Sequence, residues 1–467
     1  MGNTPPYYST NRNISIEGKP AFRKSVSFKE AFFMGLAPDS GLFMPDRIPA
    51  FSKDEIGDMG GKTFPQVAFA VLTKFLENEI NQKDLQSMVK DAYNFPVPVK
   101  RLKGNRYMLD LGQGPTASFK DFAAQMMARL MEYLRPKGKE ITILVATSGD
   151  TGSAVGEAYR GLKDFKVYIL YPKDEVSPIQ KKTLDCIGSN VKALAVDGKF
   201  DDCQKLVKSA FADSELNTLN LTSANSINIG RILPQITYYF YAYSQVAKED
   251  EEIVFSIPSG NFGNAFGCEL ARRMGVPVKK MVISVNENDA FPKFLETEKY
   301  AKVSPSKNCL SNAMNVGNPS NLARFFDLYG GNLDKEGFVH KMPDIKEMRN
   351  RLFSVSIDDE QTMKAMKEAL ETDKLILEPH GAVAYAGLNK YLASHNNDGM
   401  CDGDTPSIFI ETANPGKFPE VVETVLKQKP VLPKSLKKML LREPNMQSIP
   451  NSYEKLRTIL LMDYGKH

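Results

Sequence analysis

The sequence predicts an α/β fold that is divided into two or three lobes. The chain has 467 residues, and single hydrophobic cores stop growing near about 250–300 residues. From about residue 105 onward, short apolar runs rich in Val, Ile and Leu alternate with longer helical patterns. This alternation is typical of βα units around a parallel sheet. The first hundred residues lack it, so we expect them to form an N-terminal lobe.

The apolar runs give the strand prediction, and each early run leads into Gly, Ser, Asp or Asn before a helical pattern. The predicted strands are residues 107–111, 141–146, 167–171, 191–196, 253–257, 281–285 and 407–410. Residues 27–35 and 63–77 are expected to be helical. The expected domains are an N-terminal lobe (1–98), a large domain (99–140 and 225–467) and a small α/β domain (141–224).

Composition argues against several classes of function. Hydrophobic residues make up 42% of the chain and charged residues 25%, which describes a globular protein with ample material for a core. The net charge of +4 comes from 60 basic and 56 acidic residues without a dense Lys/Arg stripe. Phosphate-backbone binding needs such a stripe, so we expect no nucleic-acid partner.

The cysteines and the start of the chain indicate a reducing compartment. The cysteines are scattered and form no C-x-x-C pair: Cys186, Cys203, Cys268, Cys309 and Cys401. This pattern predicts free thiols and argues against disulfides and zinc, and the four histidines form no H-E-x-x-H motif. No apolar run approaches the roughly 18 residues of a membrane span, and the start lacks a signal core. We expect a cytoplasmic protein without a metal, and the sequence leaves monomer or homodimer open.

The turn Ser259-Gly-Asn-Phe-Gly-Asn264 lies between the predicted strand 253–257 and a helical run. The N-terminus of a helix presents free N–H groups and the positive end of the helix dipole, so it can hold a phosphate. Gly260 and Gly263 would let the backbone approach the anion closely. Glycine-rich turns are also common in α/β folds without this role.

A second strand-to-helix turn is Ala146-Thr-Ser-Gly-Asp-Thr-Gly-Ser-Ala154. It would form another anion site, sized for a substrate carboxylate. One alternative is a capped helix start with Ser148 or Asp150 as the N-cap. Another is dinucleotide binding with Asp174 as the ribose acceptor, although the G-x-G-x-x-G spacing is absent.

Lys120 stands in Pro115-Thr-Ala-Ser-Phe-Lys-Asp-Phe122, directly after the predicted strand 107–111. Ser118 and Asp121 predict a capping box, which places Lys120 in the first turn of a helix. The positive helix end and the apolar neighbours disfavour the ammonium form, so we expect a free amine for imine formation. The alternative is a solvated surface lysine.

Two further segments carry polar residues in suggestive positions. In residues 223–231, Asn228 and Arg231 are three residues apart and could clasp a phosphate ester, or form a polar cap with a surface arginine. Thr412 follows the last predicted strand, where ligand-binding loops of open α/β sheets lie.

Together, the S-F-K-D-F, T-S-G-D-T-G and S-G-N-F-G-N motifs in this order resemble the fold-type II (tryptophan synthase β-like) pyridoxal 5′-phosphate (PLP) enzymes. The N-S-I-N-x-x-R segment makes the chain similar to the threonine synthase family in particular, over nearly its whole length. The resemblance implies two open, mostly parallel sheets flanked by helices, with PLP in the large domain. It also implies a carbon–oxygen lyase that converts O-phosphohomoserine and water into L-threonine and phosphate.

The resemblance also implies roles for individual residues. Lys120 would be the Schiff-base lysine and proton shuttle, and Thr412 would face the pyridine nitrogen. The cofactor phosphate would be held by Gly260, Asn261, Phe262, Gly263 and Asn264. The substrate carboxylate would border Ser148, Gly149, Asp150 and Thr151, and the substrate phosphate would contact Ser226, Asn228 and Arg231. Asn414 departs from the family, whose members usually carry histidine there.

A hydroxyl at residue 412 cannot protonate the pyridine as a carboxylate can, so Thr412 predicts a moderated electron sink. A related phospholyase or dehydratase that yields 2-oxobutyrate would share Lys120 and the 259–264 turn. A non-catalytic PLP-binding or partner protein would be marked by loss of the lysine, which is present.

Overall fold

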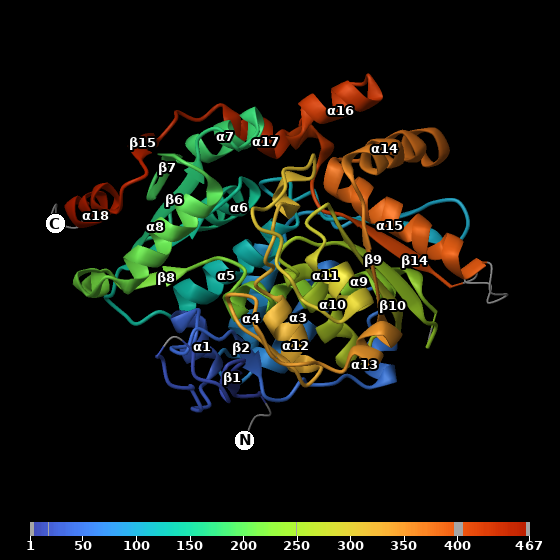
Figure 1. Cartoon of the computed structure of the whole chain (residues 1–467), viewed down its shortest axis with the longest axis horizontal. Helices are drawn as coiled ribbons and strands as arrows, with labels where there is room; N and C mark the ends of the chain where they lie inside the picture. Colours follow the sequence, from blue (N-terminus) through green and yellow to red (C-terminus); the bar gives the residue numbers. More distant parts are fainter. Residues whose placement is uncertain (1–3, 17, 249, 397–404, 464–467) are drawn as a thin grey trace. The chain divides into compact units, whose positions relative to one another are not determined.

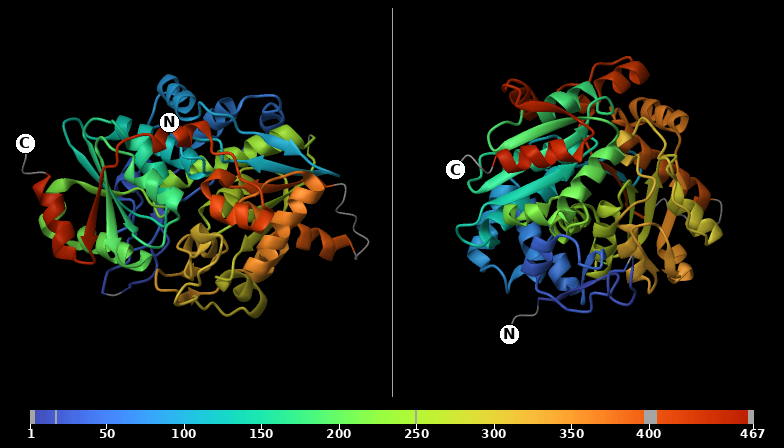
Figure 2. Two further views of the ribbon diagram at one scale, coloured as in Figure 1. Left: turned by 90° about the horizontal axis from the view of Figure 1, so that it is seen from above. Right: turned by 60° about the vertical axis from the view of Figure 1, so that its left-hand side comes forward.

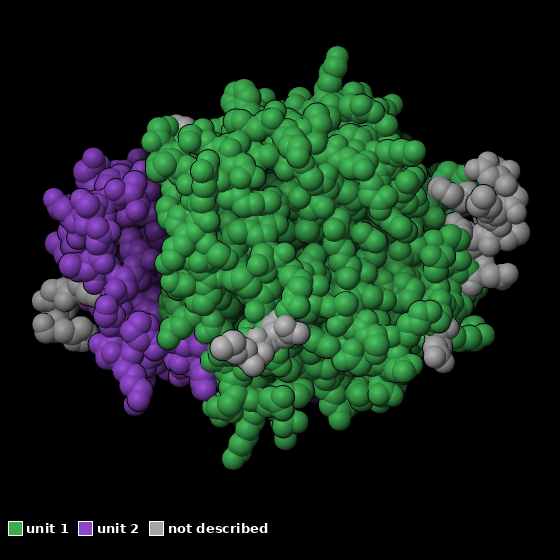
Figure 3. All heavy atoms as spheres, turned by 90° about the horizontal axis from the view of Figure 1, so that it is seen from below, with its two compact units in different colours: residues 1–113, 226–431 green, residues 114–225, 432–467 purple. Residues whose placement is uncertain are grey.

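The computed structural model describes residues 4–16, 18–248, 250–396 and 405–463 (Figure 1). Its chain forms two compact units, which Figure 3 colours separately. The first unit comprises Met1–Gln113 and Ser226–Val431, and the second comprises Gly114–Asn225 and Leu432–His467. None of the described helices is long and apolar enough to cross a membrane.

The first unit is built on a six-stranded sheet. Its strands, in spatial order, are β13 (Leu352–Ser356), β10 (Val278–Val285), β9 (Ile253–Pro258), β14 (Ser407–Glu411), β4 (Arg106–Asp110) and β3 (Val99–Arg101). Neighbouring strands are parallel except for β3, which pairs antiparallel with β4. Every residue of β9 and β14 is buried, as is typical of parallel strands with both faces covered.

Alternate residues of these strands face opposite helix layers. Val254 packs in the cluster formed with α14 (Asp359–Asp373) and α15 (Pro379–Asn396). The ring of its neighbour Phe255 contacts Tyr239 of α9 (Leu233–Val246) at 5.1 Å between centroids. The helices α10 (Gly263–Arg273) and α3 (Phe64–Leu76) pack against α9 on that side (Figure 2).

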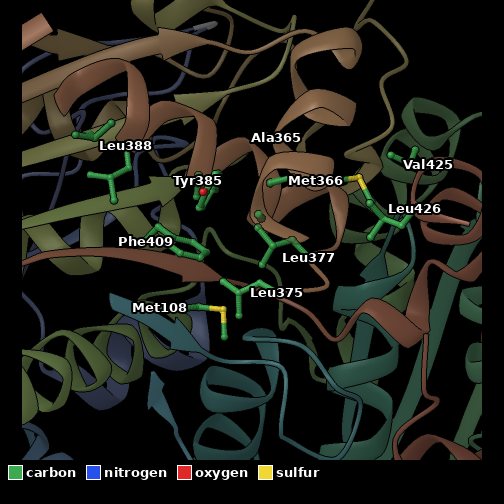
Figure 4. Packing of buried hydrophobic residues seen from close by; sticks show 14 of the residues in the cluster. Met108, Ala365, Met366, Leu375, Leu377, Tyr385, Leu388, Phe409, Val425 and Leu426 are labelled. Atoms are coloured by element: carbon green, nitrogen blue, oxygen red, sulfur yellow. The ribbon is translucent and has the colours of Figure 1, made fainter. Parts of the chain in front are cut away.

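The largest side chains of the α14 and α15 face form a continuous core (Figure 4). Phe409 of β14 and Met108 of β4 lie under Tyr385 of α15, and Met366 of α14 lies in the same cluster. Phe409 and Met366 have no exposed surface. This packing fixes β14, the strand that leads to Thr412.

The N-terminal residues of the first unit are mainly helical, and a small antiparallel sheet precedes the long helices. The remaining elements of this unit are β1 (Tyr7–Ser9), α1 (Phe28–Met34), β2 (Phe43–Pro45), α2 (Lys53–Gly57), α4 (Gln82–Ala92), α11 (Ala290–Thr297), α12 (Leu322–Leu328), β11 (Asn332–Leu333), β12 (Val339–Lys341), α13 (Ile345–Arg351) and α16 (Pro419–Leu426).

The second unit is built on a five-stranded parallel sheet. Its strands, in spatial order, are β15 (Met446–Pro450), β7 (Val191–Asp197), β6 (Phe165–Pro172), β5 (Ile141–Ala146) and β8 (Leu221–Ser223). The helices α8 (Phe200–Ala212) and α18 (Tyr453–Met462) pack together over one set of buried side chains. The sheet also carries α6 (Asp150–Tyr159) and α7 (Pro178–Asp185), while α5 (Lys120–Leu134) packs against α6, and α17 (Lys434–Leu440) against α7.

The predicted α/β fold with two open, mostly parallel sheets and an N-terminal lobe is confirmed. All the predicted strands form, and their ends differ from the predicted ones by at most three residues. The borders between units differ from the expected domains. Residues 1–98 belong to the first unit, whereas residues 114–140 belong to the second because α5 packs against α6. Residues 432–467 also belong to the second unit, since β15 pairs with β7.

Four cysteines are free and buried: Cys186, Cys203, Cys268 and Cys309. Cys401 lies outside the described residues.

The buried core predicts a large difference between two phenylalanines of the first unit. Replacing Phe409, which has no exposed surface, with alanine should cost about 3–5 kcal/mol of unfolding free energy because it leaves a cavity. Phe338 is 69% exposed, so Phe338→Ala should change it by no more than about 0.5 kcal/mol. Urea unfolding followed by circular dichroism measures both. Equal effects would contradict this placement of the core.

Candidate active site

The ends of three neighbouring strands gather the polar residues of the first unit. The strands β9, β14 and β4 are adjacent and parallel, so their carboxyl ends lie at one edge of the sheet. Residues 259–264 follow β9, and Thr412 follows β14. Ligands of open α/β sheets bind at this edge.

The turn after β9 exposes the start of α10. Its N-cap is Phe262, which adopts a left-handed conformation (φ 62°) and gives no side-chain hydrogen bond to the helix. The first N–H groups of a helix have no intrahelical acceptor and carry the positive end of the dipole. The turn therefore has the features of an anion site.

Asn264 holds this turn in place. Its side-chain amide donates to the carbonyl of Pro258 (2.7 Å), and its Oδ1 accepts from Ala265 N (2.9 Å) and from Ser259 Oγ (3.3 Å). Asn264 thus ties the end of β9 to the first turn of α10. The buried Phe262 ring packs at 4.9 Å, between centroids, against Phe291.

Residues 313–321 also shape the turn, and the sequence did not point to them. A Cβ added to Gly260 would lie 2.8 Å from Met314 Cα, so only glycine fits this approach. Asn261 Oδ1 accepts hydrogen bonds from Ser320 N (3.4 Å) and Ser320 Oγ (3.3 Å). The segment has no strand or helix periodicity, and only the folded chain brings it to the turn.

Thr412 is buried, with 5% of its surface exposed. Its hydroxyl donates to Glu378 Oε1 at 3.3 Å. Asn414, two residues later, caps the short turn Pro415–Lys417 by accepting from Gly416 N (2.9 Å). Asn414 therefore has a local structural contact at the position where the family usually carries histidine.

The structure gives the predicted phosphate clasp of residues 226–231 a different local geometry. Asn228 caps the 3₁₀ turn Ile229–Arg231, where its Oδ1 accepts from Gly230 N (2.9 Å). Its amide donates to the carbonyl of Phe32 (2.9 Å), and the residue is fully buried. These contacts suit Asn228 to positioning the turn. Arg231 is 3% exposed, so it is not the surface arginine of the alternative interpretation.

A second buried arginine holds the same segment, and it was missed in the sequence. Arg324 has no exposed surface, and it donates to the carbonyls of Ser226 (3.3 Å), Ile227 (2.7 Å) and Phe43 (3.2 Å) and to Asn321 Oδ1. Burial lowers the pKa of Arg324 to about 9. The signal in the sequence was an arginine within the short apolar run of residues 322–326.

In the second unit, Lys120 is the first residue of α5. Only half of the predicted capping box forms. Asp121 Oδ2 accepts from Ser118 N (3.4 Å), but the N-cap is Phe119, and Ser118 Oγ has no partner among the described residues. The N–H of Asp121 donates to the backbone carbonyl of Ser118 (3.0 Å) and not to its hydroxyl. The Asp121 carboxylate also accepts from the N–H and the hydroxyl of Thr116 (2.9 and 2.7 Å).

Lys120 faces a carboxylate from the second predicted anion loop. Lys120 Nζ lies 3.5 Å from Asp150 Oδ2, and Gln180 Nε2 donates to Asp150 Oδ1 (3.0 Å). Lys120 Nζ is also 4.7 Å from the centre of the Phe119 ring. The apolar neighbour was expected, whereas Asp150 favours the ammonium form and acts in the opposite direction.

The loop itself is closed by Thr147. Its Oγ1 accepts from the N–H groups of Gly149 (3.0 Å) and Gly152 (2.9 Å). Gly149 is the N-cap of α6, with φ 134° and no side-chain cap. Neither Ser148 nor Asp150 takes the N-cap position, so the alternative of an ordinary side-chain cap is wrong. Ser148 and Thr151 are partly exposed.

Comparisons with known proteins place the chain. A pyridoxal-phosphate dependent enzyme model matches residues 95–401, and threonine synthase models match residues 7–93 (N terminus) and 381–460 (C-terminal). Threonine synthase from Escherichia coli is 39% identical over 94% of this chain and 97% of its own. The chain belongs to the threonine synthase family. Threonine synthase from Saccharomyces cerevisiae is 34% identical, over 94% of each chain.

Solved structures of threonine synthases match along their whole length. The yeast structure has a TM-score of 0.88 and 31% identity, covering 100% of both chains. The PLP-bound structure from Brucella melitensis has a TM-score of 0.88 and 32% identity, covering 98% of this chain and 99% of that one. As a threonine synthase family member, the chain is a PLP-dependent lyase. The uncapped start of α10 fits a cofactor with a phosphate group, and the Lys120 amine fits one with an aldehyde.

The glycines of the α10 turn allow a test that separates the protein from the cofactor. Gly260→Ala should lower the melting temperature of the PLP-free protein and weaken PLP binding at least about tenfold, since its Cβ meets the backbone at 2.8 Å. Gly263→Ala meets no protein atom closer than 3.4 Å, so it should weaken PLP binding alone. Thermal melting and PLP titration measure both effects. Unchanged PLP affinity in both variants would move the phosphate site elsewhere.

Proposed function

We propose that this chain converts O-phosphohomoserine and water into L-threonine and phosphate, the last step of threonine biosynthesis. The observation that carries the proposal is its likeness to threonine synthases of bacteria and yeast over at least 94% of the chain. The cytoplasmic location stays a prediction from the sequence.

PLP supplies an electron sink next to the α-carbon of the substrate. Lys120 would hold the cofactor covalently, and the start of α10 would bind its phosphate. The N–H groups for this contact belong to Gly260, Asn261, Phe262, Gly263 and Asn264. Thr412 would face the pyridine nitrogen.

The substrate has a carboxylate and a phosphate, and each would have its own site. The carboxylate would border Ser148, Gly149, Asp150 and Thr151 at the start of α6, where N–H groups favour an anion. The Asp150 side chain is already paired with Lys120, so we assign the carboxylate to the backbone of this loop. The phosphate would lie at Ser226 and Arg231, with Asn228 fixing their turn.

Lys120 would move the protons. As a free amine it would take the proton from Cα and then one from Cβ, and phosphate would leave from Cγ. The proton from Cβ would go to Cγ, which becomes the methyl group. Water would add its hydroxyl at Cβ while its proton goes to the released phosphate, and Cα would regain its proton. Asp150, 3.5 Å away, would stabilise the ammonium that Lys120 becomes after each transfer.

Lys120 is the first residue to test. Borohydride should fix PLP on Lys120, and Lys120→Ala should lower turnover by several orders of magnitude because the proton shuttle is lost. Lys137 is an exposed lysine of the same unit, and Lys137→Ala should leave labelling and turnover unchanged. Peptide mapping identifies the labelled lysine. A label on another lysine would overturn the assignment.

Arg231 tests recognition of the substrate phosphate. Arg231→Ala should cost about 2–5 kcal/mol in kcat/KM for O-phosphohomoserine, because a buried charge-assisted contact is lost, while PLP stays bound. Arg23 is exposed, and Arg23→Ala should change kcat/KM by less than about 0.5 kcal/mol. Steady-state kinetics with threonine and phosphate both quantified decide this. Near-normal kcat/KM for Arg231→Ala would remove it from the site, and 2-oxobutyrate as the wild-type product would favour the phospholyase or dehydratase.

A further inference from the structure

Two glutamates and a histidine form a buried hydrogen-bonded group beside Thr412 in the first unit. Glu411 is the last residue of β14, Glu378 directly precedes α15, and His380 lies in the first turn of that helix. All three side chains are buried. Among the described residues no group of acidic, histidine or cysteine side chains is arranged to hold a metal ion, and this includes these three.

The protons around Glu378 can be assigned, because backbone N–H groups only donate. Glu378 accepts from His380 N (2.9 Å) and Gly381 N (2.9 Å). Ala313 N donates to His380 Nε2 (3.1 Å), so the ring proton is on Nδ1, which donates to Glu378 Oε2. The Thr412 hydroxyl donates to Glu378 Oε1 (3.3 Å). These donors leave Glu378 purely an acceptor.

Glu378 and Glu411 are neighbouring buried carboxyl groups, and like charges disfavour the loss of both protons. We assign the remaining proton to Glu411. Burial and then the charge of Glu378 raise the pKa of Glu411 well above its ordinary value. Glu411 Oε1 accepts from Glu378 N (3.1 Å), and its Oε2 has no partner among the described residues. The N–H and O–H donors that converge on Glu378 fit its carboxylate form, so Glu411 is the member of the pair that holds a proton.

We propose that Glu378 orients the Thr412 hydroxyl as a hydrogen-bond acceptor and so keeps the pyridine nitrogen of PLP protonated. The inference rests on the proposed function, which places Thr412 opposite that nitrogen. The only hydroxyl proton of Thr412 points to Glu378, so Thr412 offers lone pairs to the ring. A protonated ring nitrogen can donate a hydrogen bond to the Thr412 oxygen. An unprotonated nitrogen would instead place its lone pair against those of this oxygen, which is repulsive.

The charge of Glu378 acts in the same direction. Glu378 is fully buried, and only the Thr412 hydroxyl would separate it from a ring nitrogen opposite Thr412. Its charge would then stabilise a positive ring in surroundings of low dielectric. Glu378 is thus a positioning residue that gives Thr412 the effect of a carboxylate. This reverses the expectation of a moderated electron sink, which considered Thr412 alone.

Glu378 could instead serve only as a helix cap. Its carboxylate accepts from the first turn of α15, much as Asp358 accepts from Gln361 N (2.7 Å) at the start of α14. A cap alone would affect stability and leave the ring nitrogen unchanged. Asp358→Asn is therefore the matched control for Glu378→Gln.

The test reads the 15N chemical shift of PLP labelled at the ring nitrogen in the holoenzyme, together with circular dichroism to establish folding. We expect a protonated nitrogen in the wild type, in Thr412→Ser and in Asp358→Asn. Glu378→Gln and Thr412→Val should lose the protonated signal, with a fall in kcat of at least tenfold.

An unprotonated nitrogen in the wild type would overturn the inference, and so would a protonated nitrogen that persists in either Glu378→Gln or Thr412→Val. If Glu378→Gln does not fold, Thr412→Val decides, because valine keeps the shape of threonine and replaces its hydroxyl with a methyl group. Products from O-phosphohomoserine score the proposed function separately. A wild type that forms threonine with an unprotonated ring nitrogen would overturn this inference alone.

Discussion

The buried guanidinium of Arg324 is the interaction on which the polar segments of the first unit depend. It joins the carbonyl of Phe43 to those of Ser226 and Ile227, which are neighbours in the chain but lie far from Phe43. Arg324 forms no ion pair with a described carboxylate, and burial lowers its pKa only to about 9, so it stays charged at neutral pH. The cost of burying that charge is offset by hydrogen bonds that no neutral side chain could make together. The result is a fixed turn before Arg231 and a positive interior beside it.

Helix starts without side-chain caps are the second constraint. The start of α10 has Phe262 as its N-cap and that of α6 has Gly149, and neither gives a side-chain hydrogen bond. Both follow parallel strands whose carboxyl ends form the ligand edge of their own sheet. An Asn, Ser or Asp N-cap would fill such a helix start. Here Thr147 Oγ1 accepts from the N–H of Gly152 in α6, and Asn264 Oδ1 accepts from that of Ala265 in α10, while neither N-cap side chain covers the N–H groups that come before them.

Local signals explain what the sequence could predict. Apolar runs and turn residues that are neighbours in the chain predict the strands, the two anion turns and the helix start at Lys120. Contacts between residues that are distant in the chain leave no such local pattern, so they could not be predicted. Ser320 reaches Asn261 across 59 positions and Arg324 reaches Phe43 across 281. The capping box of Ser118 formed only in part, because the N–H of Asp121 donates to the Ser118 carbonyl instead of its hydroxyl. The S-x-x-D pattern does not distinguish these two acceptors.

In each unit, a residue proposed to meet the cofactor has a buried carboxylate behind it. Asp150 lies behind Lys120, and Glu378 lies behind Thr412. A carboxylate only accepts, so it determines where its neighbour's protons point. Asp150 thus favours the ammonium form of Lys120, which must lose a proton before it can act as a base or react with the PLP aldehyde. Glu378 accepts the hydrogen bond of the Thr412 hydroxyl, so this hydroxyl can only accept from a third group. The motifs supply the reactive groups, and carboxylates distant in the sequence or held by another helix set their protonation.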